Sequence, residues 1–598
     1  MRIPLRLSAL RTLMKNQGLH AYLIPSTDPH QSEYVPLLWR RREWISGFTG
    51  SAGDVAVTLT KAAMWTDGRY FLQAENQLAG SGIALMKLGM PNTPTIALWL
   101  GKQLKKGQRV GVDPRVLSFA QFQKIRSDLN GLGITLVSIE CNLVDELWAD
   151  RPPAPDGQIE VHSLRFTGER FQDKLKHLRK TMAEAGTKAH VVAALDQIAW
   201  LFNIRGSDVQ YNPLVIAYGI VTDKKAVLYT DLKKVTPELR RSLGKSAEIK
   251  DYSAFRAGLL QLSRSGQPVW MDPSTTNQWI VELLGRKVKL LFKESPIVLM
   301  KAAKNAVEIR GMKQAHIRDG VAMVKFLCWF EQAVGKEKLT EISVADKLEQ
   351  FRAKSKLFRG LSFDTIIGYA AHGAIIHYSA TSETDIPVRK KGLMIVDSGG
   401  QYPDGTTDIT RTLLPGAPSP EQKNFYTRVL KGHIAVATTS FPVGTSGRQL
   451  DTLARRALWD SGVDYGHGTG HGVGAYLSVH EGPQSISPTK EQAGTPLLPG
   501  MVISNEPGYY KAGEYGIRIE NLVYITKDAE RSNRDKTFLK FENLTLCPIE
   551  TRLIDTRLLT KEEIRYFNAY HAKVRRTLTR FLDKKEAAWL AKATRPIK

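Results

Sequence analysis

The chain has 598 residues, of which 42% are hydrophobic, and carries a formal net charge of +25. A single hydrophobic core stops growing near roughly 250 to 300 residues, so this length predicts about three domains. No apolar run reaches the roughly 18 residues of a membrane span, and the basic first residues lack the apolar core of a secretory signal. We therefore expect a cytoplasmic protein without a membrane partner.

The positive charge by itself would suit a nucleic acid partner. Lys and Arg are spread along the chain, however. They are densest in residues 551–598, which contain 13 Lys or Arg and 5 Asp or Glu. Solvated faces of helices account for that segment, and the aromatic and glycine signatures of RNA-binding modules are absent. We expect no nucleic acid partner.

The three cysteines lie far apart at Cys141, Cys328 and Cys547. Without a closely spaced pair they form neither a zinc knuckle nor a redox motif. They are interpreted as core thiols in a reducing compartment.

A proline-rich polar stretch at residues 149–158, "ADRPPAPDGQ", is typical of a linker. It predicts a first domain over 1–155 and a second over 156–299, with the next boundary in "KESPIVLMKAAKN".

The two segments before that boundary resemble each other. "LRTLMKNQGLHA" pairs with "LRKTMAEAGTKA", "WISGFTGS" with "WLFNIRGS", and "MWTD" with "LYTD", in the same order in both. Three matches in one order predict a duplicated α/β unit.

The third segment, 300–540, alternates long helical stretches with apolar strands, which is an α+β pattern. In its first helical stretch, apolar residues recur at spacings of three and four: Ile317, Val321, Val324 and Cys328.

Two aspartates of this segment flank a predicted turn. The apolar run 393–396 predicts a strand that ends in Asp397, "YPDG" at 402–405 predicts a turn, and the chain then returns to Asp408. A hairpin would bring the two carboxylates together, where they need neutralisation, and metal ions are the expected source.

Two glutamates follow the same pattern. Glu506 comes after the apolar run 501–503, and Glu520 lies in the alternating strand "YGIRIENLVYI". The alternative for Glu520 is an exposed ion pair with Arg518, which would stabilise little.

The stretch "GHGTGHGVG", residues 466–474, contains His467 and His471. The zinc-helix interpretation fails because Gly468 replaces the required Glu and because glycine disfavours helix by about 1 kcal/mol at each position. A phosphate loop also fails, since no Gly-Lys-Ser/Thr ending follows. An extended or turning backbone remains, with glycines that admit close approach of a ligand. One imidazole and four carboxylates suit two divalent ions such as Mn²⁺, Co²⁺ or Zn²⁺.

The ordered segments "IVDSGGQYPDGTTDITRT", "GHGTGHGVGAYLSVHEGP", "ISNEPGYY" and "GIRIENLV" resemble those of the dinuclear metallopeptidases of the pita-bread fold. The whole chain resembles their large, three-domain Xaa-Pro aminopeptidases. The resemblance implies a multidomain α/β and α+β protein with two creatinase-like N-terminal domains, a pita-bread catalytic domain, and a C-terminal extension over 541–598 that packs on that domain and ends in a basic tail.

The resemblance also assigns roles to residues. Asp408 and Glu520 would bridge two metal ions, and Glu506 would act as the acid/base group for the nucleophilic water. The implied ligand set is Asp397, Asp408, His471, Glu506 and Glu520.

Further implied site residues contact the substrate. His480 would contact the peptide carbonyl, with His377 and His480 counted as catalytic together with Glu506. His467 and His377 would hold the proline side, and Arg518 is a further candidate for substrate binding. His372 lies in the same stretch as His377 but fits the motif less well.

The implied activity is removal of the first residue from peptides whose second residue is proline, with two divalent ions, Mn²⁺ above all, in a homodimer. Two alternatives remain open. One is a prolidase, which takes dipeptides, and the other is a metal-free pita-bread protein that binds a partner.

Overall fold

A computed structural model describes residues 2–488 and 491–598. The chain forms two compact units, Met1–His162 with Glu169–Ile297 and Ser163–Gly168 with Val298–Lys598. In the part of the chain that is described, no helix is long and apolar enough to cross a membrane.

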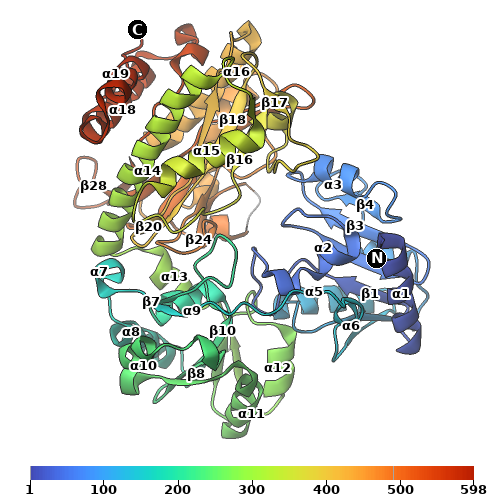
Figure 1. Ribbon diagram of the computed structural model, residues 1–598. Coiled ribbons are helices and arrows are strands. Elements are labelled where there is room, and N and C mark those ends of the chain that lie inside the picture. Colours follow the sequence, from blue (N-terminus) through green and yellow to red (C-terminus); the bar gives the residue numbers. More distant parts are fainter. Residues whose placement is uncertain (1, 489–490) are drawn as a thin grey trace. The chain divides into compact units, whose positions relative to one another are not determined.

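The N-terminal unit contains two six-stranded sheets (Figure 1). The strands of the first are, in spatial order, β4 (Ala84–Lys87), β3 (Ala62–Thr66), β2 (Asp54–Thr58), β1 (Ala21–Ile24), β5 (Arg109–Val112) and β6 (Thr135–Ser138). Those of the second are β12 (Glu248–Asp251), β11 (Ala226–Thr230), β10 (Ala217–Thr222), β8 (Ala189–Val192), β13 (Val269–Met271) and β14 (Leu290–Phe292).

The two sheets have the same topology. In each, the first strand pairs antiparallel with the second and parallel with the fifth, and both outer pairs are parallel. The matched sequence segments lie on equivalent elements: α1 (Ile3–Asn16) and α8 (Phe171–Glu184) precede the first strands, and the "WTD" and "YTD" segments end β3 and β11. The predicted duplication is confirmed.

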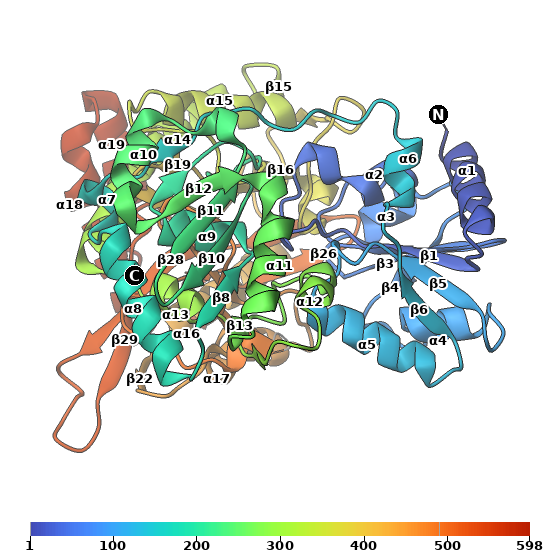
Figure 2. The ribbon, with the colours of Figure 1, turned by 90° about the horizontal axis from the view of Figure 1, so that it is seen from below.

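Helices cover both sheets, as the buried, nearly continuous apolar strands require (Figure 2). Besides α1 and α8, the helices of this unit include α5 (Phe119–Asn130), α11 (Phe255–Ser265), α3 (Phe71–Gln77), α9 (Leu195–Leu201), α10 (Pro237–Leu243) and α12 (Gln278–Leu284), with the shorter α2 (Arg41–Ser46), α4 (Ile96–Gly101) and α6 (Leu143–Leu147).

The C-terminal unit begins with a long helix, α14 (Ala306–Ala333), followed by α15 (Glu341–Ala353). Asn305 and Glu308 form a capping box at the start of α14, and the residues predicted to repeat along a helix lie on it. Both helices pack against a three-stranded antiparallel sheet. Its strands are β16 (Ile366–Tyr369), β18 (Met394–Ser398) and β21 (Ile409–Leu413).

A second, six-stranded sheet follows in the same unit, and α16 (Pro420–Ala437) and α17 (Gly447–Trp459) pack on it. Its strands are, in spatial order, β22 (Ser440–Pro442), β29 (Phe538–Asn543), β28 (Asn521–Asp528), β25 (Val502–Asn505), β23 (Gly470–Gly472) and β24 (Glu481–Ile486). A separate hairpin joins β26 (Gly508–Lys511) to β27 (Tyr515–Arg518).

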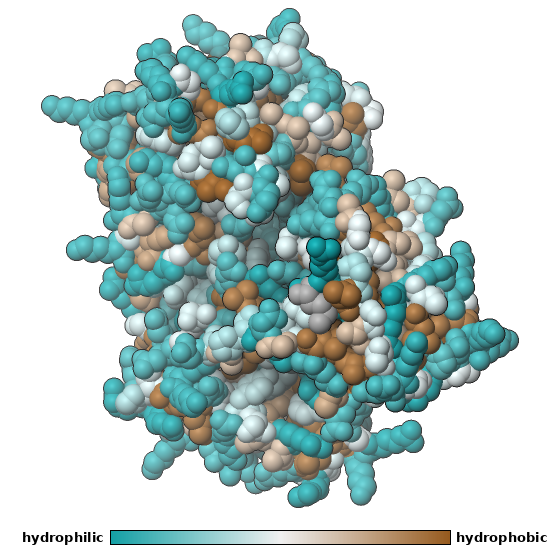
Figure 3. Space-filling view, turned by 45° about the vertical axis from the view of Figure 1, so that its right-hand side comes forward, coloured by the Kyte–Doolittle hydropathy of each residue, from teal (hydrophilic) through white to brown (hydrophobic). Residues whose placement is uncertain are grey.

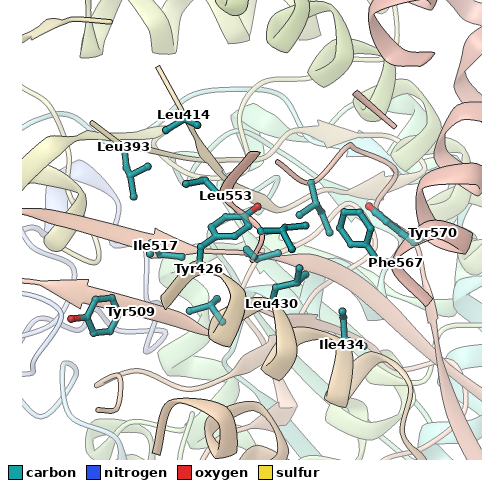
Figure 4. Close-up of a cluster of buried hydrophobic side chains, with 14 of the residues drawn as sticks. Leu393, Leu414, Tyr426, Leu430, Ile434, Tyr509, Ile517, Leu553, Phe567 and Tyr570 are labelled. Carbon is teal, nitrogen blue, oxygen red and sulfur yellow. The ribbon is translucent and has the colours of Figure 1, made fainter. Parts of the chain in front are cut away.

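The C-terminal segment is built into the core of this unit. Helix α18 (Lys561–Leu578) buries Phe567 and Tyr570 against Tyr426 and Leu430 of α16 (Figure 4). Helix α19 (Lys584–Ala593) is tied to α14 by an ion pair between Lys325 and Glu586. The basic tail is therefore amphipathic helix, as the solvated-face interpretation predicted.

One expectation about the cysteines is wrong. Cys328 and Cys547 are buried, but Cys141 is exposed, because it follows β6 in a surface connection instead of entering a core. On the face seen in Figure 3, hydrophilic side chains predominate and apolar ones occur in small groups.

Candidate metal centre

Asp397 and Asp408 are brought together by the predicted hairpin. Asp397 lies in β18 opposite Thr410 of β21, and Asp408 directly precedes β21. Between them β19 (Gln401–Tyr402) and β20 (Gly405–Thr406) close the turn. The predicted hairpin is confirmed.

Glu520 reaches the same place from a break between two strands. "YGIRIENLVYI" was predicted as one strand, but it divides into β27 and β28 with Ile519 and Glu520 between them. Ile519 packs into the hydrophobic core, while the backbone N–H of Glu520 donates to the carbonyl of Thr410 at 3.1 Å. The hydroxyl of Thr410 donates to Oε2 of Glu520 at 2.8 Å. The break thus holds Glu520 beside β21.

Glu506 and His471 come from neighbouring strands of the larger sheet. Glu506 follows β25, and His471 is the middle residue of β23. Ser504 connects them: its hydroxyl donates to Oε1 of Glu506 at 2.9 Å and accepts the backbone N–H of His471 at 2.9 Å.

Three of these side chains form a compact ligand set. Asp408, His471 and Glu520 each offer an atom, and these atoms lie within 4.8 Å of one another. Nε2 of His471 is 3.5 Å from Asp408 and 3.3 Å from Glu506. The Nδ1–H donates to the carbonyl of Gly472 at 3.1 Å, which leaves Nε2 directed at the carboxylates.

Two carboxylate oxygens of the site are buried without a hydrogen-bond partner among the described residues. They are Oδ1 of Asp397 and Oε1 of Glu520. Such atoms are costly to bury unless a cation or donor binds them. Oxygen-rich sites with one imidazole suit divalent ions, so the residues present fit a metal centre.

The electrostatics of the site point the same way. Burial and then the charge of Asp408 raise the pKa of Glu506 to about 7, although His471 and Arg518 oppose this. Burial also raises the pKa of Asp397 to about 6 against the pull of Arg518, and burial with Asp408 raises that of Glu520 strongly. Burial lowers the pKa of His471, but Asp408 and Glu506 more than offset it and raise this pKa to about 9. The site therefore holds more carboxyl groups than its own cationic side chains, Arg518 and His471, neutralise.

Arg518 does not pair with Glu520, contrary to the exposed-pair alternative. It is 2% exposed, and Nη2 donates to Oδ2 of Asp397 at 2.6 Å. Its other nitrogens donate to Thr410 at 3.1 Å and to Tyr510 at 2.7 Å. Arg518 therefore holds Asp397, and its expected contact with substrate stays a prediction.

Tyr510 was missed by the sequence reasoning. Its hydroxyl links Arg518 to Nε2 of His467, at 2.7 and 2.8 Å. Tyr509 beside it packs into the hydrophobic core, because successive residues of β26 face opposite sides. Nothing in "GYY" tells the two tyrosines apart.

The predicted substrate histidines are placed as follows. The ring of His480 is 4.4 Å from that of His471, at an interplanar angle of 84°. His377 is partly exposed, next to the buried Tyr378. His372 donates from Nδ1 to Glu341 at 2.9 Å, and this buried acid also accepts from Tyr378, so His372 braces the local fold.

The glycines of the 466–474 stretch approach the protein's own backbone. A Cβ at Gly470 would lie 1.9 Å from the carbonyl oxygen of Ser504, and one at Gly472 would lie 2.3 Å from that of Glu481. At these two glycines the close approach is therefore to β25 and β24 of the protein itself, and close approach of a ligand elsewhere in the stretch stays a prediction. The predicted extended or turning backbone is confirmed, since residues 470–472 form β23 and the rest of the stretch is bend or loop without helix.

Comparison with known proteins agrees with this architecture. Residues 310–527 match the metallopeptidase family M24, and 537–597 match the C-terminal region of that family. Residues 6–147 and 150–308 each match the creatinase/prolidase N-terminal domain. The chain belongs to metallopeptidase family M24. The predicted fold class, two creatinase-like domains before a pita-bread domain, is confirmed.

Relatives that align with nearly the whole chain show which M24 proteins it resembles. The chain is 44% identical to "Probable Xaa-Pro aminopeptidase P" of Aspergillus fumigatus over 99% of its own length and 92% of that protein. It is also 44% identical to "Aminopeptidase P2" of Arabidopsis thaliana, over 99% of this chain and 88% of that one. The crystal structure of X-prolyl aminopeptidase from Caenorhabditis elegans, described as a cytosolic enzyme with a di-nuclear active site, aligns over 100% of both chains with a TM-score of 0.96 and 37% identity. The chain thus aligns with these relatives along nearly its whole given length.

Proposed function

We propose that this M24 protein is a metal-dependent aminopeptidase that hydrolyses the N-terminal Xaa-Pro bond of peptides. The observation that carries the proposal is the ligand set of the buried Asp408 and Glu520 with the partly buried His471. Beside it lie carboxylate oxygens that have no hydrogen-bond partner among the described residues. The likeness along the whole chain to Xaa-Pro aminopeptidases supports the substrate class.

The five sequence-predicted ligands would hold two divalent ions, with Asp408 and Glu520 shared between them. We propose Mn²⁺, with Zn²⁺ or Co²⁺ as substitutes, because carboxylates dominate the donor set. When bound, such ions lower the pKa of a water and polarise a carbonyl. The ligand set is Asp397, Asp408, His471, Glu506 and Glu520.

Glu506 is proposed as the group that moves the proton. Ser504 donates to Oε1, which fixes the orientation of the carboxyl group. It would accept a proton from the attacking water and return that proton to the departing proline nitrogen.

The histidines are proposed to bind the substrate. A bond to proline has no N–H to donate, so side-chain donors must orient the peptide. His480, next to His471, would donate to the carbonyl oxygen of the scissile bond. His377 and His467 would contact the proline side.

Further features are proposed on the same basis. The domain limits are 1–155, 156–299, 300–540 and 541–598. The protein is proposed to act in the cytoplasm, which agrees with the description of the C. elegans enzyme, and to form a homodimer.

The test is release of the first residue from the tripeptide Arg-Pro-Pro by Mn²⁺-loaded protein. We expect metal-dependent release of Arg, and its absence in folded, metal-loaded protein would refute the proposal. An Xaa-Pro dipeptide tested in parallel distinguishes the aminopeptidase from a prolidase, because a prolidase would prefer the dipeptide. An empty metal site together with salt-sensitive RNA binding would instead favour the metal-free binding protein.

A further inference from the structure

The loop that carries His467 connects α17 to β23 and includes Gly466 and Gly468. Glycines give a backbone many accessible conformations, so a loop of this composition does not fix a side chain by itself. In the structure, however, the loop is attached to α17 by hydrogen bonds to the two residues of a buried ion pair in that helix.

Arg455 of α17 is the centre of this attachment. It is 3% exposed, and its guanidinium donates to the carbonyls of His467 and Tyr465, at 2.7 Å each. It also donates to Asp464 at 2.8 Å, and it lies 4.0 Å above the ring of Tyr465. One side chain therefore holds three successive parts of the loop.

Asp451, one turn earlier on α17, closes the network. Its Oδ2 accepts from Nε of Arg455 at 2.7 Å, and its Oδ1 accepts from the hydroxyl of Thr469 at 2.7 Å. The hydroxyl of Thr469 also lies 2.5 Å from that of Tyr465. Both ends of the loop thus attach to the same helix.

The imidazole of His467 is fixed from its other side. Nδ1–H donates to the carbonyl of Gly468 at 2.8 Å, so in the neutral ring Nε2 accepts from the hydroxyl of Tyr510, also at 2.8 Å. Arg455 sets the backbone of His467 and Tyr510 sets its ring. Either restraint alone would leave the imidazole free to turn or to shift.

We propose that Arg455 and Asp451 are positioning residues that hold His467 for recognition of proline. This inference rests on the proposed aminopeptidase activity. Both side chains are buried and their polar atoms bind the protein, so they do not touch the substrate. Their loss weakens substrate binding and proline preference and leaves the metal ligands in place.

The test compares Arg455→Met with Arg456→Met on the same helix. Arg456 is 75% exposed and pairs with Asp460, so its loss controls for removing a guanidinium from α17. kcat, KM and bound metal are measured with Arg-Pro-Pro and with Arg-Ala-Pro. Activity of the wild-type protein is established first, so that failure of the proposed function is recognised separately.

For Arg455→Met we expect KM for Arg-Pro-Pro to rise roughly tenfold or more, with kcat changed less than about threefold, because binding common to ground and transition states is lost. The preference for proline over alanine falls, bound metal is unchanged, and Arg456→Met behaves as wild type. Arg455→Lys restores part of the effect, since a lysine keeps the charge but not the fork of donors.

Unchanged KM and proline preference in folded Arg455→Met would overturn the proposal, as would loss of metal together with kcat. If Arg455→Met does not fold, Thr469→Val removes only one hydroxyl of the network. A smaller rise in KM in the same direction supports the proposal, and wild-type kinetics of Thr469→Val would overturn it.

Discussion

Several carboxyl groups buried in one place destabilise a protein unless positive charge neutralises them. Arg518 compensates Asp397, and His471 lies between Asp408 and Glu506. Glu520 is held by the neutral hydroxyl of Thr410, and one of its oxygens has no partner in the described chain. The divalent ions proposed above would supply the missing charge, so we expect these residues to be sensitive to substitution and to pH.

Asp408→Asn removes one of the charges proposed to be shared between two metal ions. We expect activity to fall roughly a thousandfold or more, since a metal contributes several kcal/mol to the transition state and each 1.4 kcal/mol is about tenfold in rate. The fold should survive, because the amide is isosteric. Circular dichroism and kcat on Arg-Pro-Pro test this, with the exposed Asp460→Asn as control, and retained activity would refute the bridging role.

Metal binding should strengthen as pH rises from 6 to 8. In the metal-free protein the pKa is about 7 for Glu506, about 6 for Asp397 and about 9 for His471. Below these pH values the side chains carry protons, which the metal ions must displace. Calorimetric titration with Mn²⁺ at several pH values, in buffers of different ionisation enthalpy, measures affinity and proton release. A pH-independent affinity without proton release would contradict these pKa values.

The same pKa shifts determine whether the stability of the metal-free protein rises or falls with pH. Carboxyl groups whose pKa is raised on folding bind more protons in the native state than in the unfolded one. Their contribution to stability is therefore lost as pH rises from about 4.5 through the folded pKa of about 7 for Glu506. The histidine acts in the same direction at higher pH, because its raised pKa favours folding below about 6.5 and that contribution is lost through about 9.

At the scale of elements, the site depends on how closely β23 and β25 approach. Gly470 lies against the carbonyl of Ser504, and the hydroxyl of that serine aligns both His471 and Glu506. A side chain at position 470 would separate the two strands and their ligands together.

Gly470→Ala should destabilise the protein by about 1–3 kcal/mol, the range for overpacking, and should reduce metal affinity. Gly466→Ala is the matched control in the same stretch, since a Cβ there meets nothing within 4 Å. Denaturant unfolding and Mn²⁺ titration measure both effects. Equal behaviour of the two variants would show that the strand contact does not determine the site.

At the scale of the whole molecule, the proposed ligands all belong to one of two compact units. Residues 1–162 and 169–297 form the other unit, with two hydrophobic sheets of its own. The C-terminal segment belongs to the unit that contains the proposed ligands. Arg411 donates to the backbone carbonyls of Cys547 and Glu520, at 2.9 and 2.6 Å, and to the hydroxyl of Tyr570 at 3.1 Å. A ligand that binds there stabilises that unit by mass action.

Chelation should lower the unfolding temperature of the C-terminal unit alone. At free metal about 100-fold above Kd, binding stabilises by about 2.7 kcal/mol, which corresponds to several degrees. Differential scanning calorimetry with and without EDTA, followed by Mn²⁺ addition, should show one transition that moves and recovers and one that stays. A joint shift of both would mean that the units unfold together.

Local chemistry explains which features could be predicted from the sequence. Turn residues at 402–405 predicted the hairpin of Asp397 and Asp408, the spacing from Ile317 to Cys328 predicted α14, and the glycines excluded a helix around His471. These depend on short-range sterics and periodicity, which sequence carries directly.

Other features are set by residues distant in the chain, and only the tertiary structure decided them. The segment "YGIRIENLVYI" is interrupted at Glu520, because that residue forms hydrogen bonds with Thr410 of β21. In the tertiary structure Arg518 pairs with Asp397 and not with Glu520. The hydroxyl of Tyr510 binds His467, whereas Tyr509 packs in the hydrophobic core, and Cys141 lies on the surface.

The sequence by itself thus determined the ordered acids and histidines, the duplicated N-terminal domains and the class of metal site, since these follow from residue type and spacing. The tertiary structure decided which charges pair, which tyrosine meets a histidine, and how Arg455 fixes a glycine-rich loop. The physical reason is that electrostatic and hydrogen-bond energies depend on distances between residues far apart in the chain, and packing alone sets those distances.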